Sequence, residues 1–220
     1  MPDNLSIAEI QSAFFEYRAN FSEPIFAYWF ERRHGEIVST LHKALARWHV
    51  GLENVTWNQA PKNAGEILLT FGIPSLFATI QVGLGGVTMT AFNPDWSRAA
   101  ELTSLFQNGL EALKKSTAQN LQSQLTTLGF HVSPTAKPFK DIVGQFVNVN
   151  ALNAADAVMY GFSVYSKDYS FVIDSSGVIA GGVFIKLIRS FAPERQFEEM
   201  ASALRSDEES VLQRLGLKLQ

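Results

Sequence analysis

Few side chains in this 220-residue chain have a type and spacing that could support chemistry. Cysteine is absent, which excludes disulfides, thiolate metal ligands and cysteine nucleophiles. His42 and His49 stand seven residues apart, whereas two metal-binding histidines on one helix usually stand three or four apart. We therefore predict no metal site and no bound cofactor.

Sequence motifs for nucleophilic catalysis and phosphate binding are also missing. The chain has no Gly-x-Ser-x-Gly motif, and the glycine-rich run at 83–86 is not followed by the Lys and Ser/Thr of a phosphate loop. Asp156, Asp168 and Asp174 could form a carboxylate cluster, but each lies in a predicted turn or loop, where solvated aspartate is common. Whether the chain is an enzyme stays open, and we favour a protein without catalytic activity.

An aromatic and basic stretch near the amino terminus is the first candidate for recognition. Eight aromatic residues fall within the 17 residues from Phe14 to Phe30. Tyr, Trp and Arg are enriched at interface hot spots. The alternative is a buried helix that caps the sheet and leaves its arginines in water. The predicted binding residues are Tyr28, Trp29, Phe30, Arg32 and Arg33.

A second set of polar residues belongs to a different hypothesis. If the chain is a small enzyme or a small-molecule-binding domain, a pocket between two halves would be lined by apolar groups and a few polar ones. The polar candidates are His131, Asp141, Tyr160 and Asp174. A third possibility is that the protein binds another polypeptide along an unpaired edge strand.

The first 50 residues show a helical pattern. Ser6 and Glu9 fit a capping box ahead of an apolar stripe. Pro24 suits a second helix start, and a third helix is predicted from about Gly35 to Trp48. These residues therefore predict an aromatic helical segment.

From about residue 54 the apolar period changes to two, which is typical of strands. Alternation in 66–73, 76–82 and 87–92 predicts a hairpin closed by the glycines at 83–86, and 158–173 and 183–188 predict further strands. The second face of these strands mixes polar residues with large apolar ones. This mixture predicts that the amino-terminal helices or a partner chain cover part of that face. The apolar residues in question are Phe77, Phe92, Phe184 and Ile188.

Two segments of the chain follow the same order. Each has a Gly-Gly-Val sequence, at 85–87 and at 181–183, followed by a proline that opens a helical pattern. Each helical pattern ends in Leu-x-x-Leu-Gly, at Gly129 and at Gly216. The sequence therefore predicts an internal repeat. Gly109 inside the first helix predicts close packing, because glycine there costs about 1 kcal/mol relative to alanine.

These patterns predict an α+β fold. The expected architecture is a mainly antiparallel sheet built from two related hairpin-helix-strand halves, with an aromatic-rich helical segment at the amino terminus. The predicted parts of one compact domain are an amino-terminal helical segment at 1–53, a first half at 54–149 and a second half at 150–220.

Composition guides the functional prediction. A net charge of −3 lacks the basic field that draws proteins to nucleic acid or anionic membranes. No signal-peptide pattern and no run of about 18 apolar residues is present, so we expect a cytoplasmic protein without a membrane span. With 18% charged residues and abundant aromatics, we predict a non-catalytic interaction protein that self-associates or joins a protein complex and does not bind nucleic acid.

Overall fold

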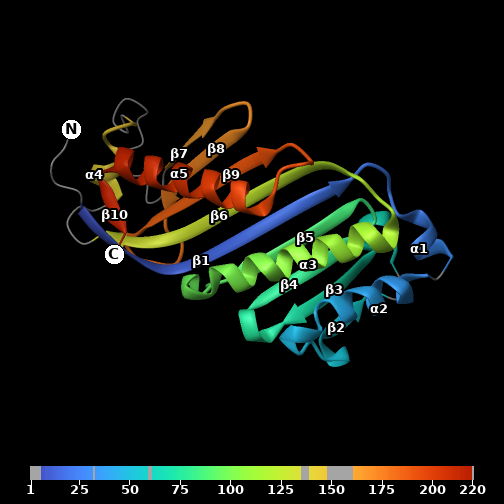
Figure 1. Ribbon diagram of the computed structural model, residues 1–220. Coiled ribbons are helices and arrows are strands. Elements are labelled where there is room, and N and C mark those ends of the chain that lie inside the picture. Colours follow the sequence, from blue (N-terminus) through green and yellow to red (C-terminus); the bar gives the residue numbers. More distant parts are fainter. Residues whose placement is uncertain (1–5, 32, 59–60, 135–138, 148–160, 220) are drawn as a thin grey trace. The chain divides into compact units, whose positions relative to one another are not determined.

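The computed structural model describes residues 6–31, 33–58, 61–134, 139–147 and 161–219 (Figure 1). The chain forms two compact units that interleave in sequence. Unit 1 comprises Met1–Phe14, Thr127–Arg189 and Glu198–Gln220, and unit 2 comprises Phe15–Thr126 and Ser190–Phe197. The two long strands β1 (Ser6–Phe21) and β6 (Leu121–Pro134) contribute residues to both units.

Strands of the described residues pair in the order β2-β3-β4-β5-β1-β6-β9-β8-β7, and β10 pairs with β1 in parallel. The neighbouring pairs from β2 to β5 and from β7 to β9 are antiparallel. The large antiparallel sheet with helices confirms the predicted α+β class. The remaining strands are β2 (Val55–Trp57), β3 (Leu68–Ile73), β4 (Ala78–Gly83), β5 (Gly86–Phe92), β7 (Gly161–Tyr165), β8 (Tyr169–Ser175), β9 (Val183–Phe191) and β10 (Leu217–Leu219).

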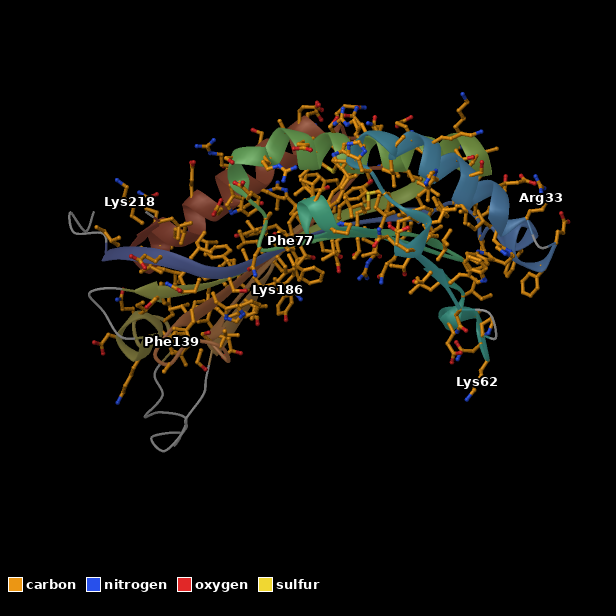
Figure 2. The ribbon with its side chains drawn as sticks, turned by 90° about the horizontal axis from the view of Figure 1, so that it is seen from below. Arg33, Lys62, Phe77, Phe139, Lys186 and Lys218 are labelled. Carbon is orange, nitrogen blue, oxygen red and sulfur yellow. The ribbon has the colours of Figure 1, made fainter. Side chains whose placement is uncertain are left out.

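In unit 2, one face of strands β3 to β5 is buried beneath helices. Phe71, Ile80 and Met89 are opposite one another in adjacent strands and are fully buried. A Cβ atom on Gly109 of helix α3 (Ala99–Thr117) would lie 3.0 Å from Ile80 and 3.3 Å from Met89, so α3 packs closely on this face, as predicted. Helices α1 (Phe26–Phe30) and α2 (His34–Ala44) also belong to this unit, and Figure 2 shows α2 and α3 on the same side of the strands.

Short 3-10 helices connect the elements of unit 2. One of them leads into α3, where the Asp95 carboxylate accepts hydrogen bonds from the backbone N–H of Ser97 at 3.0 Å and from its hydroxyl at 2.6 Å. These bonds lower the pKa of Asp95. The five segments are η1 (Ala46–Trp48), η2 (Leu52–Asn54), η3 (Ala64–Glu66), η4 (Pro74–Leu76) and η5 (Trp96–Arg98).

In unit 1, helices α4 (Phe139–Val143) and α5 (Phe197–Leu215) bury one face of strands β8 and β9. Ile173 and Ile185 face each other across these strands and belong to the same buried cluster as residues of both helices. Gly216 ends α5 with φ +67, a left-handed conformation that favours glycine. This confirms the predicted end of that helix.

Two segments predicted to be helical are strands. Residues 6–21 form β1, in which buried Tyr17, Ala19 and Phe21 alternate with exposed Arg18 and Asn20. The helical spacing of other apolar residues in this segment was misleading, because Ile7 and Ile10 are exposed.

The leucines after α3 also belong to a strand. Helix α3 ends at Thr117, and the leucines at 121–128 belong to β6. In unit 2, the second strand face lies on the side opposite α2 and α3, so α2 does not cover it. The alternative, that a partner chain covers part of this face, stays a prediction. The two related halves and the boundaries at 1–53, 54–149 and 150–220 stay predictions.

None of the helices among the described residues has the length and apolar character needed to cross a membrane.

Candidate functional site

Two residues of the predicted recognition stretch, Tyr28 and Arg33, make contacts within unit 2. The Tyr28 hydroxyl donates a hydrogen bond to the Ser116 carbonyl. Arg33 lies 4.9 Å over the Tyr28 ring and pairs with the Glu36 carboxylate at 2.9 Å. These contacts leave Tyr28 and Arg33 engaged within their own unit.

The other residues of this stretch differ in exposure. The Trp29 ring stacks on His34 with centroids 6.1 Å apart, and its indole nitrogen is buried. Phe30 is 69% exposed. Arg32 lies outside the described residues. Phe26, earlier in the same aromatic run, is 50% exposed, and its ring centroid lies 5.8 Å from that of Phe30, so these two phenylalanines form the exposed apolar part of the described stretch.

The structure brings together two of the four predicted pocket residues. His131 on β6 contacts the Phe184 ring with centroids 4.7 Å apart, and Asp174 on β8 is the cross-strand partner of Phe184. Asp141 is exposed on α4, and Tyr160 lies outside the described residues. His131 and Asp174 therefore flank one aromatic side chain of unit 1, without Asp141.

A different cluster stands out on unit 2, on the strand face away from its helices. We name this the open face of unit 2. Its central rows are formed by small polar side chains that alternate with the buried ones on β3, β4 and β5. One row contains Thr70, Gln81 and Thr88, and the next contains Gly72, Thr79 and Thr90.

Two exposed phenylalanines continue these rows at one end of the open face. Phe77 is 72% exposed and Phe92 is 54% exposed. Each phenylalanine lies two residues from the cross-strand pair Thr79 and Thr90, in the same alternation. The Phe92 N–H donates to the Phe77 carbonyl at 2.9 Å. Trp96, just beyond β5, is 48% exposed. Figure 2 labels Phe77 at this end of the strands.

The backbone at Phe77 is unusual for an aromatic residue. It has φ 47 and ψ 41, which is the left-handed conformation. For a bulky non-glycine residue this conformation costs about 1–2 kcal/mol. Phe77 ends η4, and its N–H donates to the Pro74 carbonyl at 3.2 Å in this conformation. Backbone strain of this kind clusters at functional sites.

Charges around this end of unit 2 are paired. Arg98 donates to the Ser75 carbonyl at 2.7 Å and to the Glu101 carboxylate at 2.9 Å. On the open face of unit 2, Arg18 contacts the Glu16 carboxylate at 3.2 Å. Unit 2 holds as many basic as acidic residues, so the net charge of −3 belongs to unit 1. The open face of unit 2 is therefore a polar and nearly neutral surface with aromatic side chains at one end.

The described residues include no group of three or more His, Asp or Glu placed to hold a metal ion. The sequence did mark Phe77 and Phe92 as apolar interruptions of a polar face, but we assigned them to a covered surface. Trp96 was not singled out. Trp96 could have been identified from its position shortly after a strand that ends in an exposed phenylalanine.

Comparisons with known proteins give little further information. No family model matches the chain, and no curated protein matches it in sequence. Among solved structures, one neighbour is the rolling circle replication initiator protein from Geobacillus stearothermophilus, with 10% identity and a TM-score of 0.35. The match covers 86% of this chain and 76% of the initiator chain. A likeness at this level assigns neither a family nor an activity.

This neighbour nevertheless conflicts with two sequence predictions, which we correct. We predicted a non-catalytic interaction protein that self-associates or joins a complex, with a small enzyme or ligand-binding domain as the alternative, and we excluded nucleic acid as a partner. A replication initiator among the structural neighbours contradicts both predictions. The exclusion of nucleic acid relied on the net charge of the whole chain, and that charge does not describe unit 2.

Proposed function

We propose that this protein binds single-stranded nucleic acid on the open face of unit 2, with unpaired bases stacked on Phe77 and Phe92. The supporting observation is the pair of adjacent, exposed phenylalanines on an uncovered polar sheet face. A phenylalanine ring offers a bare π-face, and base–aromatic stacking contributes about 1–3 kcal/mol per base. Nucleic acid as ligand is compatible with the predicted cytoplasmic location.

The neighbouring polar side chains suit the same ligand. Thr79, Thr88 and Thr90 present hydroxyl groups that both donate and accept hydrogen bonds, and Gln81 adds an amide. Sheet faces that combine aromatic residues with such groups recognise single strands, because unstacked bases expose both their rings and their hydrogen-bonding edges. A duplex would keep its bases stacked away from Phe77 and Phe92, so the proposal concerns unpaired strands.

The backbone strain at Phe77 makes the proposal testable. Asparagine tolerates the left-handed conformation better than phenylalanine, so Phe77→Asn should leave the free energy of unfolding unchanged or raise it by up to about 1 kcal/mol. The same substitution removes one stacking platform. We expect the affinity for a labelled single-stranded oligonucleotide, measured by fluorescence anisotropy, to fall about five- to hundredfold.

Ala118 supplies a matched control. It also has a left-handed backbone, with φ 51 at the end of α3, where glycine is favoured. Ala118→Gly should raise the free energy of unfolding by a similar amount and leave oligonucleotide affinity unchanged. If the wild-type protein binds neither single-stranded DNA nor RNA below about 100 μM, the proposal fails. It also fails if Phe77→Asn binds as well as wild type, or if a neutral polysaccharide binds in place of the oligonucleotide.

A further inference from the structure

We infer that His131 and Ser176 form a proton-sensitive latch in unit 1: while His131 is neutral, Ser176 holds the turn at residues 176–182, and protonation of His131 releases it. This inference concerns unit 1 and does not rest on the proposed nucleic-acid binding.

Ser176 organises the turn between β8 and β9. Its hydroxyl oxygen accepts hydrogen bonds from the backbone N–H groups of Val178 at 3.1 Å and Ile179 at 2.9 Å. Its own N–H donates to the Gly182 carbonyl at 2.9 Å, and the Gly182 N–H donates to the Ile179 carbonyl at 3.0 Å. Packing contributes little to this turn, because Val178 is 70% exposed and a Cβ atom on Gly177 or Gly181 would meet open space.

The hydrogen-bonding capacity of the Ser176 hydroxyl fixes the state of His131. A hydroxyl has one proton and two lone pairs. Because Val178 and Ile179 use both lone pairs, the proton is left for His131 Nδ1, which lies 2.9 Å from the Ser176 oxygen. Nδ1 must then be an unprotonated acceptor, and the ring proton sits on Nε2. With both lone pairs engaged, Ser176 is not set up as a nucleophile, despite its contact with a histidine.

The surroundings of His131 oppose a positive charge. Its ring packs on Phe184, and partial burial lowers the pKa of His131. Neither β6 nor residues 175–183 carry an acidic side chain. The charged residues next to Phe184 in the strand register are Asp174, its cross-strand partner, and Lys186, two residues along β9. These two charges have opposite signs. The charged residues of β1, the other neighbour of β6 in the sheet, are Glu9, Glu16 and Arg18, of which Glu16 and Arg18 pair with each other. Figure 2 labels Lys186 on this unit.

Protonation therefore creates a conflict at one atom pair. A protonated Nδ1 turns its N–H toward the Ser176 hydroxyl, and both groups are then donors. The hydroxyl can accept this bond only by giving up a lone pair that now serves Val178 or Ile179. One backbone N–H of the turn loses its partner, and the turn opens more often.

Hydrogen exchange followed by NMR on the full chain tests the latch. We expect the protection factors of the Val178 and Ile179 amides, corrected for intrinsic exchange, to fall about three- to tenfold between pH 7.5 and 4.5, with the midpoint at which the His131 ring titrates in the same samples. At pH 7.5, long-range nitrogen–proton spectra should show the proton of His131 on Nε2.

Variants separate the latch from general acid sensitivity. His131→Gln should remove the pH dependence of the two amides, and Ser176→Ala should give low, pH-independent protection. The matched control is His49→Asn, since His49 is exposed in unit 2 and has a left-handed backbone that asparagine tolerates. This control should behave as wild type. Unchanged protection in wild type, the same loss in His131→Gln, or an Nδ1-protonated ring at pH 7.5 would each overturn the inference.

Discussion

At the residue scale, a buried polar contact joins distant segments of unit 2. The Tyr17 hydroxyl donates to the Gln124 side-chain oxygen at 2.6 Å. The Gln124 amide nitrogen donates to the carbonyls of Ala192 and Pro193 at 3.0 Å and of Arg195 at 3.1 Å. Burial also raises the pKa of Tyr17, so its hydroxyl remains a donor at every physiological pH.

Removing the Gln124 amide should lower the free energy of unfolding. Gln124→Leu leaves the buried Tyr17 hydroxyl without its acceptor, and an unsatisfied buried polar group costs about 1–3 kcal/mol. We expect the free energy of unfolding, measured by urea denaturation, to fall by about that amount. Ser123, next to Gln124 on β6, supplies the control. Ser123→Ala removes an exposed hydrogen bond with Asn20 of β1 and should change the free energy of unfolding by less than about 0.5 kcal/mol. Equal effects of the two changes would contradict this account.

At the element scale, strands β1 and β6 depend on one glycine. A Cβ atom on Gly129 would lie 2.2 Å from a ring carbon of Phe14, so the Phe14 ring covers the bare glycine backbone. Side chains over a strand glycine restore packing that glycine itself cannot provide. The sequence pattern assigned Gly129 to the end of a helix, because its leucine spacing outweighed the strand alternation.

This contact predicts that replacing Gly129 by alanine destabilises the protein more than replacing Gly109 does. Gly129→Ala must displace a rigid ring, and we expect the free energy of unfolding to fall by about 1–3 kcal/mol. Gly109→Ala meets only the flexible ends of Ile80 and Met89 and gains helix propensity of about 1 kcal/mol, so its net effect should be smaller. Thermal and urea denaturation of both variants check the order. A Gly129→Ala protein as stable as wild type would show that Phe14 does not pack there.

At the scale of the whole molecule, charge is divided between the units. Unit 2 is balanced, and the charges near its open face are paired within the chain. A ligand held there should be bound mainly by stacking and neutral hydrogen bonds. Phosphate neutralisation, which dominates most nucleic-acid complexes, should contribute little.

Salt dependence measures this contribution. For single strands, each neutralised phosphate adds about −0.7 to the slope of log affinity against log salt concentration. We expect a slope shallower than about −2 for wild type. Glu16→Gln should release Arg18 from its ion pair, tighten binding and steepen the slope by about 0.7. A wild-type slope steeper than about −4 would show that phosphate contacts dominate and that the neutral open face is not the binding surface.

The sequence by itself determined the features that local patterns encode. Alternating apolar residues predicted the strands from β3 to β5 and from β8 to β9, Pro94 marked the approach to α3, and Gly216 marked the end of α5. These features depend on neighbours within a few residues, where steric and hydrogen-bonding preferences act directly.

Only the tertiary structure decided the rest. It made residues 6–21 a strand, because pairing with other strands outweighed a helical spacing. It left the strand face that carries Phe77 and Phe92 on the side away from α2 and α3, and it joined His131 to Ser176 across 45 residues of chain. The packing of helices on a strand face and the contact between His131 and Ser176 join residues far apart in sequence, so no local pattern encodes them.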